Sequence, residues 1–236
     1  MIPQNPETLV LKNEFYPNGL REIDIWKYYQ KERTNILRET LGKTLMIFFA
    51  VDLNNIIVVR KNKSKGLIRL SPSNYDEIIS GRTISIHSIM DRHSNFVIID
   101  IDTDNFIKAK EVTIELYDLL NSIKIINGLR IKNVSIRFSG KSSFHIKVLF
   151  REEYQILILN HLIHSFLISK EINKKYTISH KRLKDIPNID LNRNVYNAGY
   201  ITLNSLAVTG LKCMNVDTKK IKNFKKEDTM IFKKGR

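Results

Sequence analysis

Three features are scarce in this 236-residue sequence: cysteine, long apolar runs, and linker segments rich in glycine, serine and proline. The single cysteine, Cys213, excludes an intramolecular disulfide and any cysteine-rich zinc module. No apolar run approaches the roughly 18 residues that cross a bilayer, and the first residues lack the basic-then-apolar pattern of a signal peptide. We therefore expect neither a membrane protein nor a secreted one. Without a linker or an internal repeat, we expect one domain, built of one or two lobes.

Positive charge is present in large surplus. The sequence holds 39 Lys and Arg against 24 Asp and Glu, which gives a net charge of +15. A surplus of this size favours a polyanionic partner, most often nucleic acid. The alternative is compositional, because an AT-rich genome also enriches Lys, Ile and Asn.

The apolar pattern predicts an α+β fold, with a mixed or antiparallel central sheet flanked by helices and a small N-terminal lobe. Helical spacing is expected over residues 24–40, 106–123 and 154–172. Strands are expected over 45–51, 56–60, 67–70, 96–102, 134–138, 144–150 and from residue 189. We expect residues 1–216 to form one catalytic unit of two lobes, and the Lys-rich residues 217–236 to form a basic tail.

The sharpest motif is the pair Asp100 and Asp102, at the end of the apolar segment FVIIDID. Side chains alternate along a strand, so both carboxylates emerge on one face, with their Cα atoms about 6.5–7 Å apart. They can then share a divalent cation, which would also offset the cost of placing carboxylates in an apolar strand. The alternative is a strand that runs out into a polar turn.

Two further segments carry polar groups between apolar neighbours. In SGKSSFH, residues 139–145, backbone N–H groups, hydroxyls and Lys141 can hold phosphate oxygens, and His145 follows at the start of the next strand. An ordinary hairpin turn has a similar composition. Asp190 in IPNID completes a three-carboxylate cluster or merely ends a strand. The order of the three motifs is the one expected for metal-dependent nucleotidyl transfer.

With these motifs in this order, the chain resembles the archaeo-eukaryotic primase superfamily, and most closely the end-joining polymerase domains of the ligase D type. The three motifs of the superfamily correspond to Asp100 with Asp102, to residues 139–145, and to Asp190. Three other segments resemble these polymerases: LKNEFYPNGLREIDIWKYY, TISIHS and YTISHKRLKDIPNIDLNRN. The resemblance spans roughly residues 10–216.

The resemblance implies a template-directed DNA or RNA polymerase that uses two divalent metals, Mn²⁺ or Mg²⁺. The implied catalytic residues and metal ligands are Asp100, Asp102 and Asp190. The implied contacts to the incoming nucleoside triphosphate are His87, Ser139, Gly140, Lys141, Ser142, His145 and Arg182. DNA contacts are implied for Lys12, Arg21 and Asn194. Arg21 and Glu22 stand where these polymerases usually have a Thr-Lys pair.

The implied role is to fill or extend DNA ends during double-strand-break repair, on primer–template or broken ends. A DNA ligase and an end-binding protein are then implied as partners, and the location is cytoplasmic and associated with the nucleoid. Two alternatives stay open: a primase for plasmid or viral replication, with the compartment unspecified if viral, and a catalytically silent primase-like subunit that binds nucleic acid. Three intact carboxylates argue against a silent subunit, because they repel one another to no purpose without metal.

Overall fold

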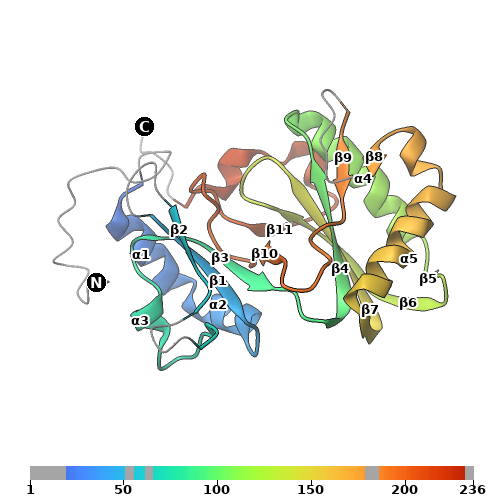
Figure 1. The fold of residues 1–236 in the computed structure, drawn as a ribbon. Coiled ribbons are helices and arrows are strands. Elements are labelled where there is room, and N and C mark those ends of the chain that lie inside the picture. Colours follow the sequence, from blue (N-terminus) through green and yellow to red (C-terminus); the bar gives the residue numbers. More distant parts are fainter. Residues whose placement is uncertain (1–19, 51–55, 62–65, 179–185, 232–236) are drawn as a thin grey trace. The chain divides into compact units, whose positions relative to one another are not determined.

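The chain folds into two compact units, as seen in a computed structural model that describes residues 20–50, 56–61, 66–178 and 186–231 (Figure 1). The first unit is drawn from residues 1–89, 199–214 and 226–236. The second is drawn from residues 90–198 and 215–225. In the described part of the chain, no helix has both the length and the apolar character needed to cross a membrane.

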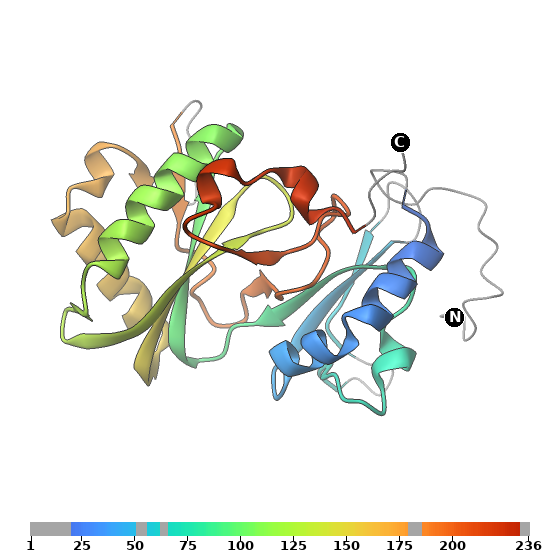
Figure 2. The ribbon, with the colours of Figure 1, turned by 180° about the vertical axis from the view of Figure 1, so that it is seen from behind.

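The first unit is built around a four-stranded antiparallel sheet in the order β10-β3-β1-β2. Its strands are β1 (Leu45–Ala50), β2 (Ile56–Val59), β3 (Thr83–Ile89) and β10 (Gly199–Ile201). Its helices are α1 (Glu22–Lys31), α2 (Arg33–Thr40) and α3 (Tyr75–Ile78). Figure 2 shows α1 and α2 lying across one face of the sheet, where Tyr28 and Tyr29 are buried in the core.

Two local predictions in this unit differ from the structure. The helix predicted over 24–40 is divided at Glu32, whose buried carboxylate accepts bonds from Nζ of Lys212 at 2.9 Å and Nδ2 of Asn35 at 2.8 Å. These two bonds hold Glu32 at the junction where α1 ends and α2 begins. Residues 67–70, predicted as a strand, contribute isolated bridges instead of a regular strand.

The second unit is built around a larger sheet in the order β11-β6-β7-β4-β9-β8, with β5 beside β6. The pairs β6–β7, β7–β4 and β4–β9 are antiparallel, and β8–β9 is parallel. The α+β class with a mixed central sheet, predicted from the sequence, is therefore confirmed. The strands are β4 (His93–Asp102), β5 (Ile125–Ile126), β6 (Leu129–Phe138), β7 (Phe144–Gln155), β8 (Thr177–Ile178), β9 (Asn188–Asp190) and β11 (Met214–Val216).

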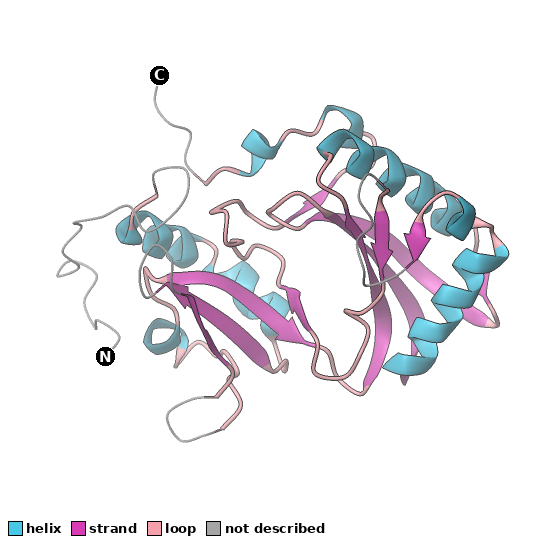
Figure 3. Ribbon diagram, turned by 45° about the horizontal axis from the view of Figure 1, so that its top comes forward, coloured by secondary structure: helices cyan, strands magenta, loops and turns pink. Residues whose placement is uncertain are grey.

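Helices α4 (Phe106–Asn121) and α5 (Ile156–Ser169) lie on the same side of this sheet (Figures 1 and 3). The Phe106 ring of α4 stacks on Phe144, with centroids 5.5 Å apart, and meets Phe138 edge-on at 6.0 Å. The face of β6 and β7 that carries these two rings is thus the helix-covered face. Because side chains alternate, the neighbouring residues of each strand lie on the opposite face.

The Lys-rich C-terminal segment is folded in its described part, residues 217–231. In the second unit, Phe224 is buried, and its ring centroid lies 5.3 Å from that of Phe138 and 5.7 Å from that of Phe144. Nζ of Lys110 donates a hydrogen bond to the carbonyl of Lys222 at 2.9 Å. The short helices Ile221–Asn223 and Lys226–Thr229 shape this segment. The prediction of a basic tail rested on the lysines of this segment and did not consider its apolar residues.

Candidate active site

The three predicted carboxylates lie on one face of the second unit's sheet. Asp100 of β4 stands directly opposite Asp190 of β9. Directly opposed residues project to the same face, and Asp102 shares that face with Asp100 because the two are two residues apart. The intervening residue, Ile101, pairs with Phe144 and therefore belongs to the helix-covered face. The carboxylates project from the face turned away from α4.

A row of four ionisable side chains crosses the sheet at this level. Arg137 of β6 is opposite His145 of β7, His145 is opposite Asp100 of β4, and Asp100 is opposite Asp190 of β9. Arg137, His145 and Asp100 are buried, with 9%, 6% and 6% of their surfaces exposed. Ionisable groups are kept in such surroundings only when they are paired or bind an ion. The row, called the charged row below, therefore places two basic and two acidic side chains next to one another across the sheet.

The carboxylate of Asp100 is surrounded by basic groups. Nε2 of His145 lies 3.5 Å from Oδ1, and Nε of Arg193 lies 3.8 Å from Oδ2. Burial raises the pKa of Asp100, but the charges of His145 and then Arg193 outweigh it, and the pKa of this carboxyl lies below its ordinary value. Asp100 is therefore ionised at neutral pH and is able to bind a cation.

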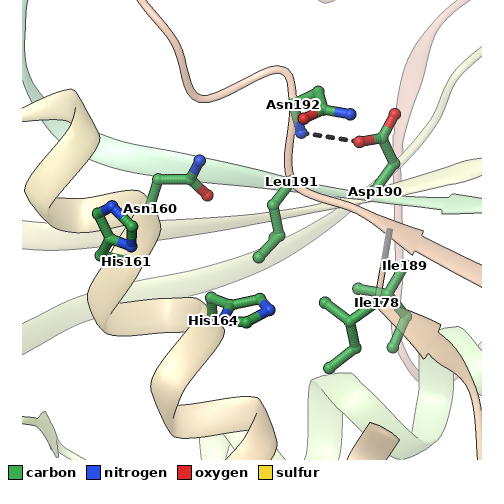
Figure 4. A pocket seen from close by; sticks show the side chains of 8 residues that line it. All are labelled: Asn160, His161, His164, Ile178, Ile189, Asp190, Leu191 and Asn192. Atoms are coloured by element: carbon green, nitrogen blue, oxygen red, sulfur yellow. Dashed lines mark hydrogen bonds between the residues drawn. The ribbon is translucent and has the colours of Figure 1, made fainter. Parts of the chain in front are cut away.

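The carboxylate of Asp190 is turned toward the chain that follows β9. Its Oδ1 accepts the backbone N–H of Asn192 at 2.7 Å (Figure 4). A cavity of about 240 Å³ lies beside α5, with His164 and Ile178 among its lining residues. Figure 4 shows the Asp190 carboxylate directed away from these two side chains. The cavity therefore extends along α5, and Asp190 and Asn192 are also among its lining residues.

The three carboxylates share a face without converging on a common point. Among the described residues, no group of three or more His, Cys, Asp and Glu side chains is arranged to hold a metal ion. The chemistry of the donors still fits a divalent cation, because carboxylate oxygens are the ligands that Mg²⁺ and Mn²⁺ prefer. Oδ1 of Asp100 is also a buried oxygen that forms no hydrogen bond with the described residues.

The turn that joins β6 to β7 is closed by its own hydrogen bonds. The N–H of Ser139 donates to the carbonyl of Ser143 at 3.0 Å, and the Ser143 hydroxyl donates to the Ser139 hydroxyl at 2.9 Å. Gly140 has φ of +83°, a left-handed conformation that glycine adopts without a Cβ clash. Lys141 is exposed and Ser142 is partly buried. The tip of the hairpin therefore presents a cation.

Two other predicted residues belong to the first unit. His87 of β3 is partly buried, and its ring lies against Phe48 with centroids 4.6 Å apart. Arg21 precedes α1 and is exposed, with Nε bonded to Oδ2 of Asp24 at 2.9 Å. An exposed arginine with a local ion pair can still exchange its carboxylate for a phosphate, so its predicted contact with DNA stays a prediction.

Asn194, predicted to contact DNA, forms hydrogen bonds within the fold, and its contact with DNA stays a prediction. It is fully buried, its Oδ1 accepts the N–H of Ile98 at 2.7 Å, and its Nδ2 donates to the carbonyl of Ile98 at 2.7 Å. Both polar atoms of the amide are thus used to continue the hydrogen-bonding of β4 beyond β9. Lys12 and Arg182, also predicted from the resemblance, lie outside the described residues.

Sequence reasoning missed three polar residues of this region: Arg137, Asn188 and Arg193. Arg137 was detectable, because alternation counted back across the hairpin places it on the face of His145. Asn188 was also detectable, since it precedes Asp190 by two residues on the same short strand. Arg193 follows β9 in a loop, where no periodicity indicates the direction of a side chain.

No family model and no curated protein matches the sequence. Among solved structures, the chain is similar to the polymerase domain of Mycobacterium tuberculosis ligase D, determined in complex with DNA. The two chains are 14% identical, the match covers 93% of this chain and 89% of the other, and the TM-score is 0.68. At this identity the similarity establishes the fold. The predicted resemblance is confirmed at that level: the chain has the fold of the ligase D polymerase domain.

Proposed function

We propose that this protein is a template-directed nucleotidyltransferase, a polymerase or primase that extends DNA with nucleoside triphosphates. The observation that carries the proposal is the direct pairing of Asp100 with Asp190 on the face that also holds Asp102. Three carboxylates on adjacent strands supply the oxygen ligands that metal-dependent nucleotidyl transfer requires. The fold shared with the ligase D polymerase domain supports the same class of reaction.

In this proposal Asp100, Asp102 and Asp190 hold two Mn²⁺ or Mg²⁺ ions. When bound, such ions stabilise negative charge on the attacking and leaving oxygens. The reaction joins the 3′-hydroxyl oxygen of a primer to the α-phosphorus of the nucleotide and breaks the bond between the α-phosphorus and the bridging oxygen. Pyrophosphate leaves, and the proton of the hydroxyl passes to water. The basic groups around Asp100 keep its carboxyl ionised for this task.

We assign the triphosphate to the end of the β6–β7 hairpin. Lys141 is exposed there, and His145 and Arg137 lie on the neighbouring strands of the charged row. The Ser139 hydroxyl accepts bonds from the Ser143 hydroxyl and from the N–H of Lys141, so its own proton is left to donate to a phosphate oxygen. The remaining proposed triphosphate contacts are His87, Gly140, Ser142 and Arg182.

We propose DNA as the bound polymer, with Lys12 and Arg21 among its contacts. The net charge of +15 supplies the cations, and the similar ligase D domain was determined with DNA. Neutralising 6–10 phosphates makes affinity fall by about 10³–10⁵ between 50 and 200 mM salt. We expect a fall of this order for a labelled primer–template. A flat response to salt would contradict the proposal that charge drives binding.

We propose that the activity fills or extends broken ends in double-strand-break repair. The test compares a labelled gapped duplex carrying a downstream 5′-phosphate with a single-stranded circle, each with Mn²⁺ and nucleoside triphosphates. Extension of the gapped duplex is expected. De novo synthesis on the circle would instead identify a replication primase, and no incorporation on either template, with DNA binding intact, would identify a silent binding subunit.

Variants of the paired carboxylates test the assignment of the site. D100A/D102A is expected to abolish extension while leaving DNA binding in place. The matched control is D118A, which removes an exposed carboxylate from α4, on the other side of the sheet, and is expected to keep full activity. Undiminished extension by D100A/D102A would overturn the proposed function.

A further inference from the structure

A buried amide stands beside the three carboxylates. Asn188 is 1% exposed and lies directly opposite Asp102 in the β4–β9 pair. It is two residues from Asp190 on the same strand, so it projects from the same face as all three carboxylates. Asp100, Asp190, Asp102 and Asn188 thus form two directly opposed pairs on adjacent strands.

The side-chain oxygen of Asn188 has no hydrogen-bond partner within the described ranges, and it is inaccessible to solvent. A buried amide oxygen without a hydrogen-bond partner has lost its hydration, and no new bond compensates for the loss. Such oxygens are rare in folded proteins unless a water molecule or an ion binds them. Oδ1 of Asp100, on the same face, already has Nε2 of His145 3.5 Å away. The unpartnered amide oxygen of Asn188, placed among carboxylates, indicates a missing positive group.

The neighbour of Asn188 across the pair decides which kind of group fits. Directly opposed side chains have Cβ atoms about 4.5–5.5 Å apart, and both Asp102 and the Asn188 carbonyl offer only acceptor oxygens toward a shared ligand. A divalent cation takes carboxylate and amide oxygens together, and both types occur among the ligands of Mg²⁺ and Ca²⁺. An apolar ligand would leave the side-chain oxygen of Asn188 without a partner.

We propose that the side-chain oxygen of Asn188 is a fourth oxygen ligand of the divalent-metal site, beside Asp102. The inference rests on the proposed function and extends its ligand set from three carboxylates to three carboxylates and one amide. An amide adds an oxygen without adding negative charge, so it does not increase the repulsion within the acidic cluster.

The test is binding of Mn²⁺ alone to the metal-free full chain, followed by electron paramagnetic resonance of the free ion. N188L, close in shape to Asn but without an oxygen, is expected to bind Mn²⁺ at least about tenfold more weakly than wild type. Its melting temperature without metal is expected to equal or exceed that of wild type, because an unpaired buried polar group is removed. N188D is expected to bind Mn²⁺ more tightly than wild type.

The matched control is N160L, because Asn160 of α5 has a second buried side-chain oxygen with no hydrogen bond to the described residues, beside the α5 cavity. N160L is expected to bind Mn²⁺ as wild type does. Wild-type affinity in N188L overturns this inference alone, whereas a wild-type chain that binds no Mn²⁺ overturns both the inference and the proposed function. If N188L fails to fold, N188D decides: tighter binding supports the inference, and unchanged or weaker binding overturns it.

Discussion

Asp100 and Asp190 face each other directly across the antiparallel pair of β4 and β9. Like charges in this position are unfavourable, because their Cβ atoms are only about 4.5–5.5 Å apart. The repulsion between the two carboxylates is reduced by one contact on each side. Nε2 of His145 lies 3.5 Å from Oδ1 of Asp100, and the N–H of Asn192 donates a hydrogen bond to Asp190 at 2.7 Å. The pair nevertheless leaves negative charge that a cation would neutralise, which links folding stability to metal binding.

Mn²⁺ is therefore expected to stabilise the wild-type protein and to stabilise D190N much less. A ligand at 100 times its dissociation constant adds about 2.7 kcal/mol to the free energy of unfolding. Without metal, D190N is expected to be more stable than wild type by about 0.2–1 kcal/mol, because a like-charge pair is removed. Asn retains the oxygen that accepts the N–H of Asn192. Urea unfolding with and without Mn²⁺ measures both effects.

The control for this experiment is D118N, an exposed substitution on α4 that removes the same charge. It is expected to respond to Mn²⁺ as wild type does. An equal Mn²⁺ effect in wild type and D190N would show that the cation binds elsewhere on the chain.

Asn194→Ala is expected to destabilise the protein without weakening DNA binding by the folded state. The substitution leaves the N–H and the carbonyl of Ile98 without their partners in a fully buried position. Each unsatisfied backbone group costs about 1–3 kcal/mol. Urea unfolding gives the loss of stability, and a DNA titration well below the melting temperature gives the affinity. Weaker DNA binding with unchanged stability would restore the contact that the sequence resemblance implied.

The sequence predicted the local geometry of the site because strand alternation is a local property. Two-residue spacing places Asp100 and Asp102 on one face, and the Ser/Gly segment before His145 predicts the hairpin turn that the structure contains. The register of Asp190 against Asp100 is not a local property, because 90 residues separate them. The order of motifs within the resemblance indicated that they meet, whereas spacing and propensity alone gave no such register.

Other features depend on partners far along the chain, which no local pattern reports. Glu32, at the break between α1 and α2, accepts a hydrogen bond from Lys212, which lies 180 residues away in the sequence. The amide of Asn194 stands in a polar segment, LNRN, that resembles a solvated loop until β4 is placed beside it. Phe224 lies among lysines in the sequence, so the composition of this segment did not indicate that its ring is buried.

Lys212→Met is expected to destabilise the first unit, and the effect is expected to depend on pH. Burial raises the pKa of Glu32, but the bonds from Asn35 and Lys212 lower it by more, so its folded-state pKa lies below the ordinary 4.5. A carboxyl with a lowered pKa stabilises the fold at neutral pH, and that contribution is lost as the pH falls through the folded-state pKa. The expected loss at pH 7 is about 1–3 kcal/mol.

Urea unfolding of wild type and K212M at pH 7 and pH 3.5 measures this dependence. The difference between the two proteins is expected to be largest at pH 7 and to shrink at pH 3.5, as Glu32 becomes protonated. Lys132→Met, at an exposed position of β6, serves as the control and is expected to stay within about 0.5 kcal/mol of wild type. A difference that grows on acidification would contradict the role of the pair.

Phe224→Ala is expected to destabilise the second unit by about 3–5 kcal/mol, the usual cost of removing a buried aromatic ring. The ring is 7% exposed and contacts a cluster in which its centroid lies 5.3 Å from Phe138 and 5.7 Å from Phe144. Urea unfolding measures the loss, and Lys222→Ala, an exposed neighbour, is the control. Because Phe144 directly precedes His145 on β7, a loosened cluster is also expected to disturb the charged row. An unchanged free energy of unfolding would instead show that residues 217–236 behave as a tail.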